Sequence, residues 1–204
     1  MRLVDGFPYR LTLLVAACAA SLLHTPASIA EQAPPAQSSD GIVQGFEPGQ
    51  RPPELAATDL KGTAQSLQAH QGEVVLLHFW ATWCPYCRAE IKKLRQIQQD
   101  YASKGVVLLS VAIDDDAAKV EKFVADQSLP YAVIAEAKTG KPLSSQFQVS
   151  GLPTTFLIDR HGLVVNRFEG QADLISALRR LLAESPAPST VSRLPSSGLQ
   201  VAPN

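Results

Sequence analysis

The 204-residue chain is long enough for one folded domain with terminal extensions, and its 46% of apolar residues suffices for a packed core. Its 18 Lys and Arg residues are balanced by 19 Asp and Glu residues, so no excess of positive charge points to nucleic acid as a partner. The sequence also shows neither a repeat array nor a metal-binding cluster.

Residues 1–30 are typical of a secretory signal peptide. Arg2 and Arg10 precede the apolar run 11–23, which is shorter than the roughly 20 residues that a transmembrane helix needs. The small residues of Ser28-Ile29-Ala30 follow, and we expect cleavage after Ala30. The mature protein would then be soluble in the periplasm or an equivalent extracytoplasmic compartment.

A second interpretation concerns Cys18. The segment Val15-Ala16-Ala17-Cys18 resembles a bacterial lipobox, in which the cysteine is lipidated and anchors the protein to the membrane. The run continues apolar beyond Cys18, where a lipoprotein usually turns polar, so simple cleavage is favoured. Both interpretations export the protein and leave one Cys pair in its folded part.

Composition divides the rest of the chain into three parts. Residues 31–50 are rich in Pro, Ser, Gln and Gly and indicate a flexible linker. Residues 185–204 have the same character and indicate a disordered tail, with a docked C-terminal extension as the alternative. Residues 51–184 alternate between apolar runs and amphipathic segments, which predicts the folded domain.

In chain order, the domain first predicts a hairpin, a buried strand and a long helix. Strand-like pieces at 54–60 and 63–67 surround a Lys-Gly turn, and residues 73–80 are almost continuously apolar, as in a strand covered on both faces. A helix over 84–103 follows, because apolar residues recur there every three or four positions. This apolar stripe consists of Ile91, Leu94, Ile97 and Tyr101.

The remaining elements complete an α/β pattern. Asp173 is a plausible N-cap for the last helix. The order strand–helix–strand–helix, then hairpin and helix, predicts an α/β sandwich with a central mixed sheet. The expected elements are a strand at 106–113, a helix at 117–127, a strand at 131–135, a short helix at 142–147, strands at 154–158 and 163–168 around a turn at 159–162, and a helix at 173–182.

The pair Cys84 and Cys87 is the most informative feature, because it lies where the buried strand ends and the helix begins. Pro85 suits the first helical position, where its missing N–H costs nothing. The helix N-terminus carries about half a positive charge and unpaired N–H groups, which stabilise a thiolate on Cys84. Cys87, one turn deeper, can resolve a mixed disulfide by thiol exchange.

A zinc site, a structural disulfide and a chance occurrence are weaker interpretations of the Cys pair. A zinc site needs two further ligands, and the exported chain has no other cysteine and only isolated histidines. A structural disulfide across so short a loop would stabilise little. A chance occurrence is disfavoured by the position of the pair after Trp83, between strand and helix.

Two segments carry a resemblance to a known family. Residues 79–90, Phe-Trp-Ala-Thr-Trp-Cys-Pro-Tyr-Cys-Arg-Ala-Glu, resemble the thioredoxin superfamily, and in particular its exported TlpA-like branch. Residues 151–159, Gly-Leu-Pro-Thr-Thr-Phe-Leu-Ile-Asp, resemble that family's cis-proline segment, and the early hairpin matches the branch's N-terminal addition. The resemblance spans about residues 51–182.

The resemblance implies a thioredoxin-like fold and disulfide exchange that needs no cofactor or metal. Cys84 would be the nucleophile and Cys87 the resolving cysteine. Pro153 would be a cis-proline facing the disulfide, since X–Pro bonds reach cis cheaply, and the backbone of Leu152 would pair with an extended substrate strand. The substrate-binding residues would be Trp83, Pro85, Tyr86, Leu152 and Pro153.

The sequence departs from the family at two positions. His78 occupies a place that is Asp or Asn in many relatives, where a buried Asp relays a proton to the resolving cysteine; a satisfied core histidine is the alternative. Lys92 replaces a frequent proline, which puts the kink of the helix in doubt. Glu90 does match a frequent acid of the branch and is a second candidate for proton transfer; the alternative is a solvated surface residue.

Function follows as an expectation from these parts. The leading hypothesis is a reductase of disulfides in exported proteins, which by resemblance could include cytochrome c precursors. Such a reductase needs an electron donor at the membrane, because its compartment is oxidising. The alternatives are a disulfide-donating oxidase of the same fold and a redox-switched binding module. A peroxidase is disfavoured, since its peroxide-reducing cysteine usually lacks the C-x-x-C partner.

Overall fold

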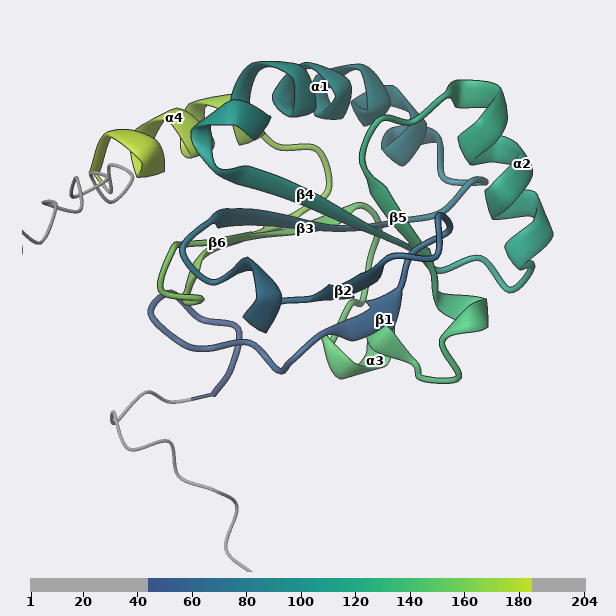
Figure 1. Ribbon diagram of the computed structural model, residues 1–204, viewed down its shortest axis with the longest axis horizontal. Coiled ribbons are helices and arrows are strands. Elements are labelled where there is room, and N and C mark those ends of the chain that lie inside the picture. Colours follow the sequence, from purple (N-terminus) through teal and green to yellow (C-terminus); the bar gives the residue numbers. More distant parts are fainter. Residues whose placement is uncertain (1–43, 185–204) are drawn as a thin grey trace, which may run out of the picture. The chain divides into compact units, whose positions relative to one another are not determined.

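The computed structural model of the protein describes residues 44–184 (Figure 1). The predicted leader, Cys18 with its lipobox, residues 31–43 of the predicted linker and the predicted tail at 185–204 lie outside the described residues. Within the described residues, no helix combines the length and the apolar character needed to cross a bilayer.

A five-stranded mixed sheet forms the centre of the fold, in the order β5-β4-β3-β6-β7. Strands β3, β4 and β5 are parallel, whereas β6 is antiparallel to both β3 and β7. The sequence analysis predicted such a sheet, and the fold is thioredoxin-like. The strands are β3 (Val74–Trp80), β4 (Val106–Ala112), β5 (Ala132–Ala135), β6 (Thr154–Ile158) and β7 (Val164–Glu169).

Helices cover both faces of this sheet. Figure 1 shows α1, α2 and α4 on one side and α3 on the other, together with the separate hairpin of β1 and β2. The helices are α1 (Pro85–Tyr101), α2 (Ala117–Gln127), α3 (Leu143–Gln146) and α4 (Leu174–Glu184); the hairpin strands are β1 (Ala56–Thr58) and β2 (Ala64–Ser66); and three 3₁₀ turns are η1 (Gln68–His70), η2 (Ala102–Lys104) and η3 (Glu136–Lys138).

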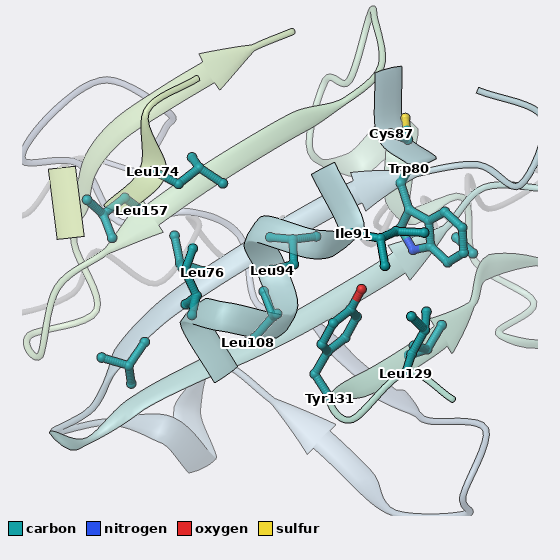
Figure 2. Close-up of a cluster of buried hydrophobic side chains, with 14 of the residues drawn as sticks. Leu76, Trp80, Cys87, Ile91, Leu94, Leu108, Leu129, Tyr131, Leu157 and Leu174 are labelled. Atoms are coloured by element: carbon teal, nitrogen blue, oxygen red, sulfur yellow. The ribbon is translucent and has the colours of Figure 1, made fainter. Parts of the chain in front are cut away.

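Strand β3 divides its side chains between two hydrophobic cores, as its alternation requires. Val75, Leu77 and Phe79 enter the core on the α3 side, whereas Val74, Leu76 and Trp80 enter the core beneath α1. Figure 2 shows the second core, in which Ile91 and Leu94 of α1 meet Leu76, Leu108 and Trp80. Burying each such aliphatic side chain contributes roughly 1.5–3 kcal/mol, which fixes α1 on the sheet.

The observed elements are shorter than predicted where side chains cap the ends. Asp59 Oδ1 accepts the N–H groups of Lys61 and Thr63, so the hairpin turn takes residues that the sequence pattern assigned to strands. Cys84 is the N-cap of α1, which therefore begins at Pro85. Asp173 caps α4 as predicted, with its Oδ1 accepting the Ser176 N–H at 3.1 Å.

The predicted boundary of the linker at residue 50 is wrong, because residues 44–50 pack against the sheet. Phe46 contacts the core on the α3 side, where its ring lies 5.5 Å from that of Phe156. The N–H of Gly49 donates to Val164 O, and the Val164 N–H donates to Gln50 O, so this segment runs along the outer strand β7. The composition of residues 31–50 did not predict this packing, because a single aromatic residue, Phe46, makes the contact with the core.

The opposite outer strand also receives a bond from the N-terminal region. The N–H of Leu60, two residues after the end of β1, donates to Val133 O of β5 at 2.8 Å. The region before β3 therefore reaches both outer strands of the sheet.

Candidate active site

The Cys pair lies at the N-terminus of α1, as the sequence predicts. Cys84 has an extended backbone, with φ −81° and ψ 114°, and Pro85 is the first helical residue. A disulfide joins Cys84 to Cys87, with 5.3 Å between their Cα atoms. The Cys87 N–H donates to Cys84 Sγ at 3.2 Å. In the reduced protein this N–H and the helix dipole would stabilise a thiolate on Cys84.

The disulfide is recessed between two exposed aromatic residues. Trp83 is 67% exposed and Tyr86 63%, whereas Cys84 is 4% and Cys87 1% exposed. A groove runs beside Cys84, lined by residues 83–86, Ile113 and residues 149–152. The five residues predicted to bind substrate therefore meet at one place: four line this groove, and Pro153 follows directly after it.

The segment that precedes β6 forms the second wall of the groove. Its Leu152–Pro153 peptide bond is cis. The Gly170 N–H donates to Pro153 O at 2.7 Å, and the Thr154 hydroxyl donates to Gly151 O at 2.8 Å. These bonds hold the backbone of Leu152 beside the disulfide, where an extended peptide could pair with it.

His78 lies in the middle of β3, on the face covered by α1, as the alternation predicts. Only 1% of the residue is exposed, and its Nδ1 is hydrogen-bonded to Thr155 Oγ1 at 2.9 Å. Among the described residues, no partner reaches its Nε2. Burial lowers the pKa of His78 from 6.5 to about 3, so the imidazole is neutral at pH 7.

Glu90 is a buried residue, so the alternative of a solvated surface acid is wrong. Only 1% of it is exposed, and its Oε1 accepts the Ala172 N–H at 3.4 Å and lies 3.5 Å from Lys93 Nζ. No described residue pairs with its Oε2. Burial raises the pKa of Glu90, an effect that the charge of Lys93 partly opposes. The carboxyl group lies one helical turn beyond Cys87.

Asp114 and Thr82, which the sequence analysis did not single out, form a contact beside the cysteines. Asp114, 5% exposed, follows β4 and accepts the Thr82 N–H at 3.0 Å and the Thr82 hydroxyl at 2.5 Å. It thereby fixes the loop that leads to Cys84. Lys92, where relatives often have proline, is exposed on a helix that runs unbroken from Pro85 to Tyr101.

The charged residues of residues 44–184 do not gather into a metal site. Nowhere in that range do three or more His, Cys, Asp or Glu residues come together in a way that could hold an ion.

Known proteins share both the fold and the sequence pattern. The model of the AhpC/TSA family matches residues 48–167. The thiol-disulfide oxidoreductase ResA of Bacillus cereus is 32% identical over 123 residues, which cover 60% of this chain and 70% of ResA. The thioredoxin-like protein YneN of Bacillus subtilis is 32% identical over 122 residues, 59% of this chain and 70% of YneN.

A solved structure agrees with these relatives. A crystal structure from Chlorobium tepidum, assigned as a thiol:disulfide interchange protein DsbE, superimposes with a TM-score of 0.61 and 30% identity, covering 69% of this chain and 98% of that one. The recessed C-x-x-C disulfide at the N-terminus of α1 agrees with the thiol–disulfide exchange that the names of these relatives state. This chain belongs to the AhpC/TSA family, and it is a thioredoxin-like thiol–disulfide oxidoreductase of the ResA and DsbE type.

Proposed function

We propose that the protein is exported and reduces disulfides in extracytoplasmic proteins, with cytochrome c precursors among its substrates. The observation that carries this proposal is the recessed Cys84–Cys87 disulfide beside an exposed apolar groove. Such a groove admits an extended protein segment, and backbone pairing along it accepts many sequences.

The first step forms a mixed disulfide. The Cys84 thiolate attacks one sulfur of the substrate disulfide, a new S–S bond forms, and the other substrate sulfur leaves as a thiolate that takes up a proton. Trp83 and Tyr86 are exposed on the rim of the groove, where they can contact the substrate chain. Pro85, Leu152 and Pro153 would hold the substrate segment beside the sulfur.

The second step releases the substrate. Cys87 loses its proton and attacks Cys84 Sγ, the mixed disulfide breaks, and the second substrate sulfur leaves as a thiol. Two electrons have then passed from the dithiol to the substrate, and Cys84 and Cys87 are joined. A dithiol donor at the membrane, itself oxidised in the exchange, would restore the reduced enzyme.

Glu90 and His78 are the two candidates for accepting the proton of Cys87. Burial disfavours the Cys87 thiolate, so a base within the protein should assist. The raised pKa of Glu90 brings its carboxylate closer in basicity to a thiol than an exposed carboxylate would be. The neutral His78 beneath α1 can accept a hydrogen bond at whichever ring nitrogen carries no proton.

Location follows from the leader. We propose cleavage after Ala30 and release into the periplasm or an equivalent compartment, with lipidation at Cys18 as the alternative that would anchor the protein to the membrane. Because such a compartment is oxidising, the enzyme would depend on an electron donor that keeps Cys84 and Cys87 reduced.

Trapping tests the proposal. Cys87→Ser should leave substrates joined to Cys84 in the native host, and the attached proteins can be identified after purification under non-reducing conditions. Cys84→Ala, which cannot form the adduct, is the matched control. Recovery of exported proteins only with Cys87→Ser supports the proposal; equal recovery from both variants, or adducts with cytoplasmic proteins, contradicts it.

Two further measurements separate the remaining functions. A reduction potential well above that of the glutathione pool would favour the disulfide-donating oxidase. Failure to turn over repeatedly with a dithiol reductant would favour the redox-switched binding module.

A further inference from the structure

Arg167, on the outer strand β7, lies far in sequence from the Cys pair but contacts the segment that forms one wall of the groove. Its Nη2 donates to Gln148 O at 2.7 Å, and Val149, the next residue, lines the groove. The same Nη2 lies 2.7 Å from Glu169 Oε1. A hydrogen bond from a charged donor is about twice as strong as a neutral one, so this contact restrains the start of the segment.

The backbone of Gln148 needs such a restraint. Its φ is 50°, in the left-handed region that residues with a Cβ rarely adopt. The surrounding contacts must therefore hold the conformation in place. At the other end of the same segment, the Gly170 N–H donates to Pro153 O at 2.7 Å. Strand β7 and the residue that follows it thus fasten residues 148–153 at both ends.

Phe46 in turn holds the guanidinium group. Arg167 Cζ lies 5.3 Å from the ring centroid of Phe156 and 5.8 Å from that of Phe46, both within the range of cation–π attraction. The ring of Phe46 also lies 6.0 Å from that of Phe147, the residue before Gln148. Phe46 belongs to the segment before the first strand, so this N-terminal residue supports the groove indirectly.

We infer that Arg167, held by Phe46, is a positioning residue that sets the shape of the groove for protein substrates. The inference rests on the proposed function, in which residues 149–152 bind an extended chain. Among the described contacts of Arg167 none involves Cys84 or Cys87, so it should affect substrate docking and leave the chemistry of Cys84 unchanged. A small disulfide needs little of the groove, whereas a protein disulfide needs both walls.

The test compares two substrates in the full-length protein. Insulin serves as the protein disulfide and 5,5′-dithiobis(2-nitrobenzoate) as the small one. Arg167→Met keeps the apolar stem but removes the guanidinium, and Arg180→Met, at an exposed position on α4, is the matched control. We expect Arg167→Met to raise KM for insulin about tenfold, as loss of one charged hydrogen bond predicts. Its kcat, its reduction potential and its rate with the small disulfide should stay within about twofold of the wild type.

Two more variants distinguish loss of the Arg167 contact from misfolding as the cause of a higher KM. Arg167→Lys can still donate to Gln148 O and should recover part of the KM. Phe46→Leu fills the space but removes the ring, and should raise KM for insulin in the same direction. Thermal unfolding of each variant shows whether it is folded.

Different outcomes would contradict the positioning role of Arg167 and the proposed reductase activity. An equal loss with both disulfides, or unchanged KM for insulin in folded Arg167→Met, overturns the positioning role. Failure of the wild type to reduce insulin over repeated turnovers would instead count against the proposed reductase.

Discussion

The buried imidazole of His78 gives a measurable acid sensitivity. In the folded protein its pKa is lowered from 6.5 to about 3, because burial disfavours the charged ring. The unfolded chain takes up this proton near pH 6.5, so between pH 6.5 and 3 the unfolded state binds more protons than the folded one. The stability that this group contributes is therefore complete above pH 6.5 and is lost as the pH falls.

The size of the effect follows from the shift. At about 1.4 kcal/mol per pKa unit, lowering the pH from 7 to 4 should cost the wild type about 3 kcal/mol through His78 alone. His78→Asn keeps a polar group beside Thr155 but cannot be charged. At pH 7 the smaller side chain should destabilise the variant by about 1–3 kcal/mol. Its free energy of unfolding should fall less steeply in acid than that of the wild type, so this deficit should shrink or reverse by pH 4.

Urea unfolding of the oxidised proteins at pH 7, 5 and 4 measures this difference. His161→Asn, at an exposed position in the turn between β6 and β7, is the matched control and should follow the wild type. If the stability difference between His78→Asn and the wild type is the same at all three pH values, the assigned pKa is wrong. The same variant tests the proton relay: rapid-mixing decay of the mixed disulfide should slow, and an unchanged decay would make His78 a core residue only.

Three other predictions concern the cysteines, Glu90 and the leader. In the reduced protein, Cys84 should titrate below about 8.5 and be alkylated before Cys87; mass spectrometry of partly alkylated protein decides this, and the reverse order would exchange their roles. Glu90→Gln should gain stability relative to the wild type as the pH rises above 4.5, because burial raises the pKa of Glu90 and its ionisation destabilises the folded state. A stability difference that does not change with pH would refute the raised pKa. The same variant should shift the pH dependence of mixed-disulfide decay modestly. N-terminal sequencing of protein from the host should begin at Glu31, whereas a lipidated Cys18 would support the other leader.

Much of the fold and the centre of the site could be predicted because their signals are local. An apolar run followed directly by Trp83, Cys84 and Pro85 specifies a buried strand, a turn and a helix start within a few residues. The two-residue period of β3 likewise placed His78 on the face beneath α1.

The supports of the site could not be predicted, since they join residues that are distant in sequence. Asp114 and Thr82 are 32 residues apart, and Arg167 and Gln148 are 19 apart. Each contact depends on which strands become neighbours in the sheet, and no window of the sequence contains that information. Phe46 was missed for the same reason, because its partners lie about 100 residues later in the chain.

The N-terminal region's bonds to the two outer strands also bear on self-association. An open sheet edge offers unpaired N–H and C=O groups on which a strand of another molecule can add. Here the Leu60 N–H occupies Val133 O on β5, while Gly49 and Gln50 occupy both backbone groups of Val164 at the start of β7. A second copy could extend the sheet at these places only by first displacing residues of the same chain. The N-terminal region therefore reduces the length of open sheet edge on which a second copy could add a strand.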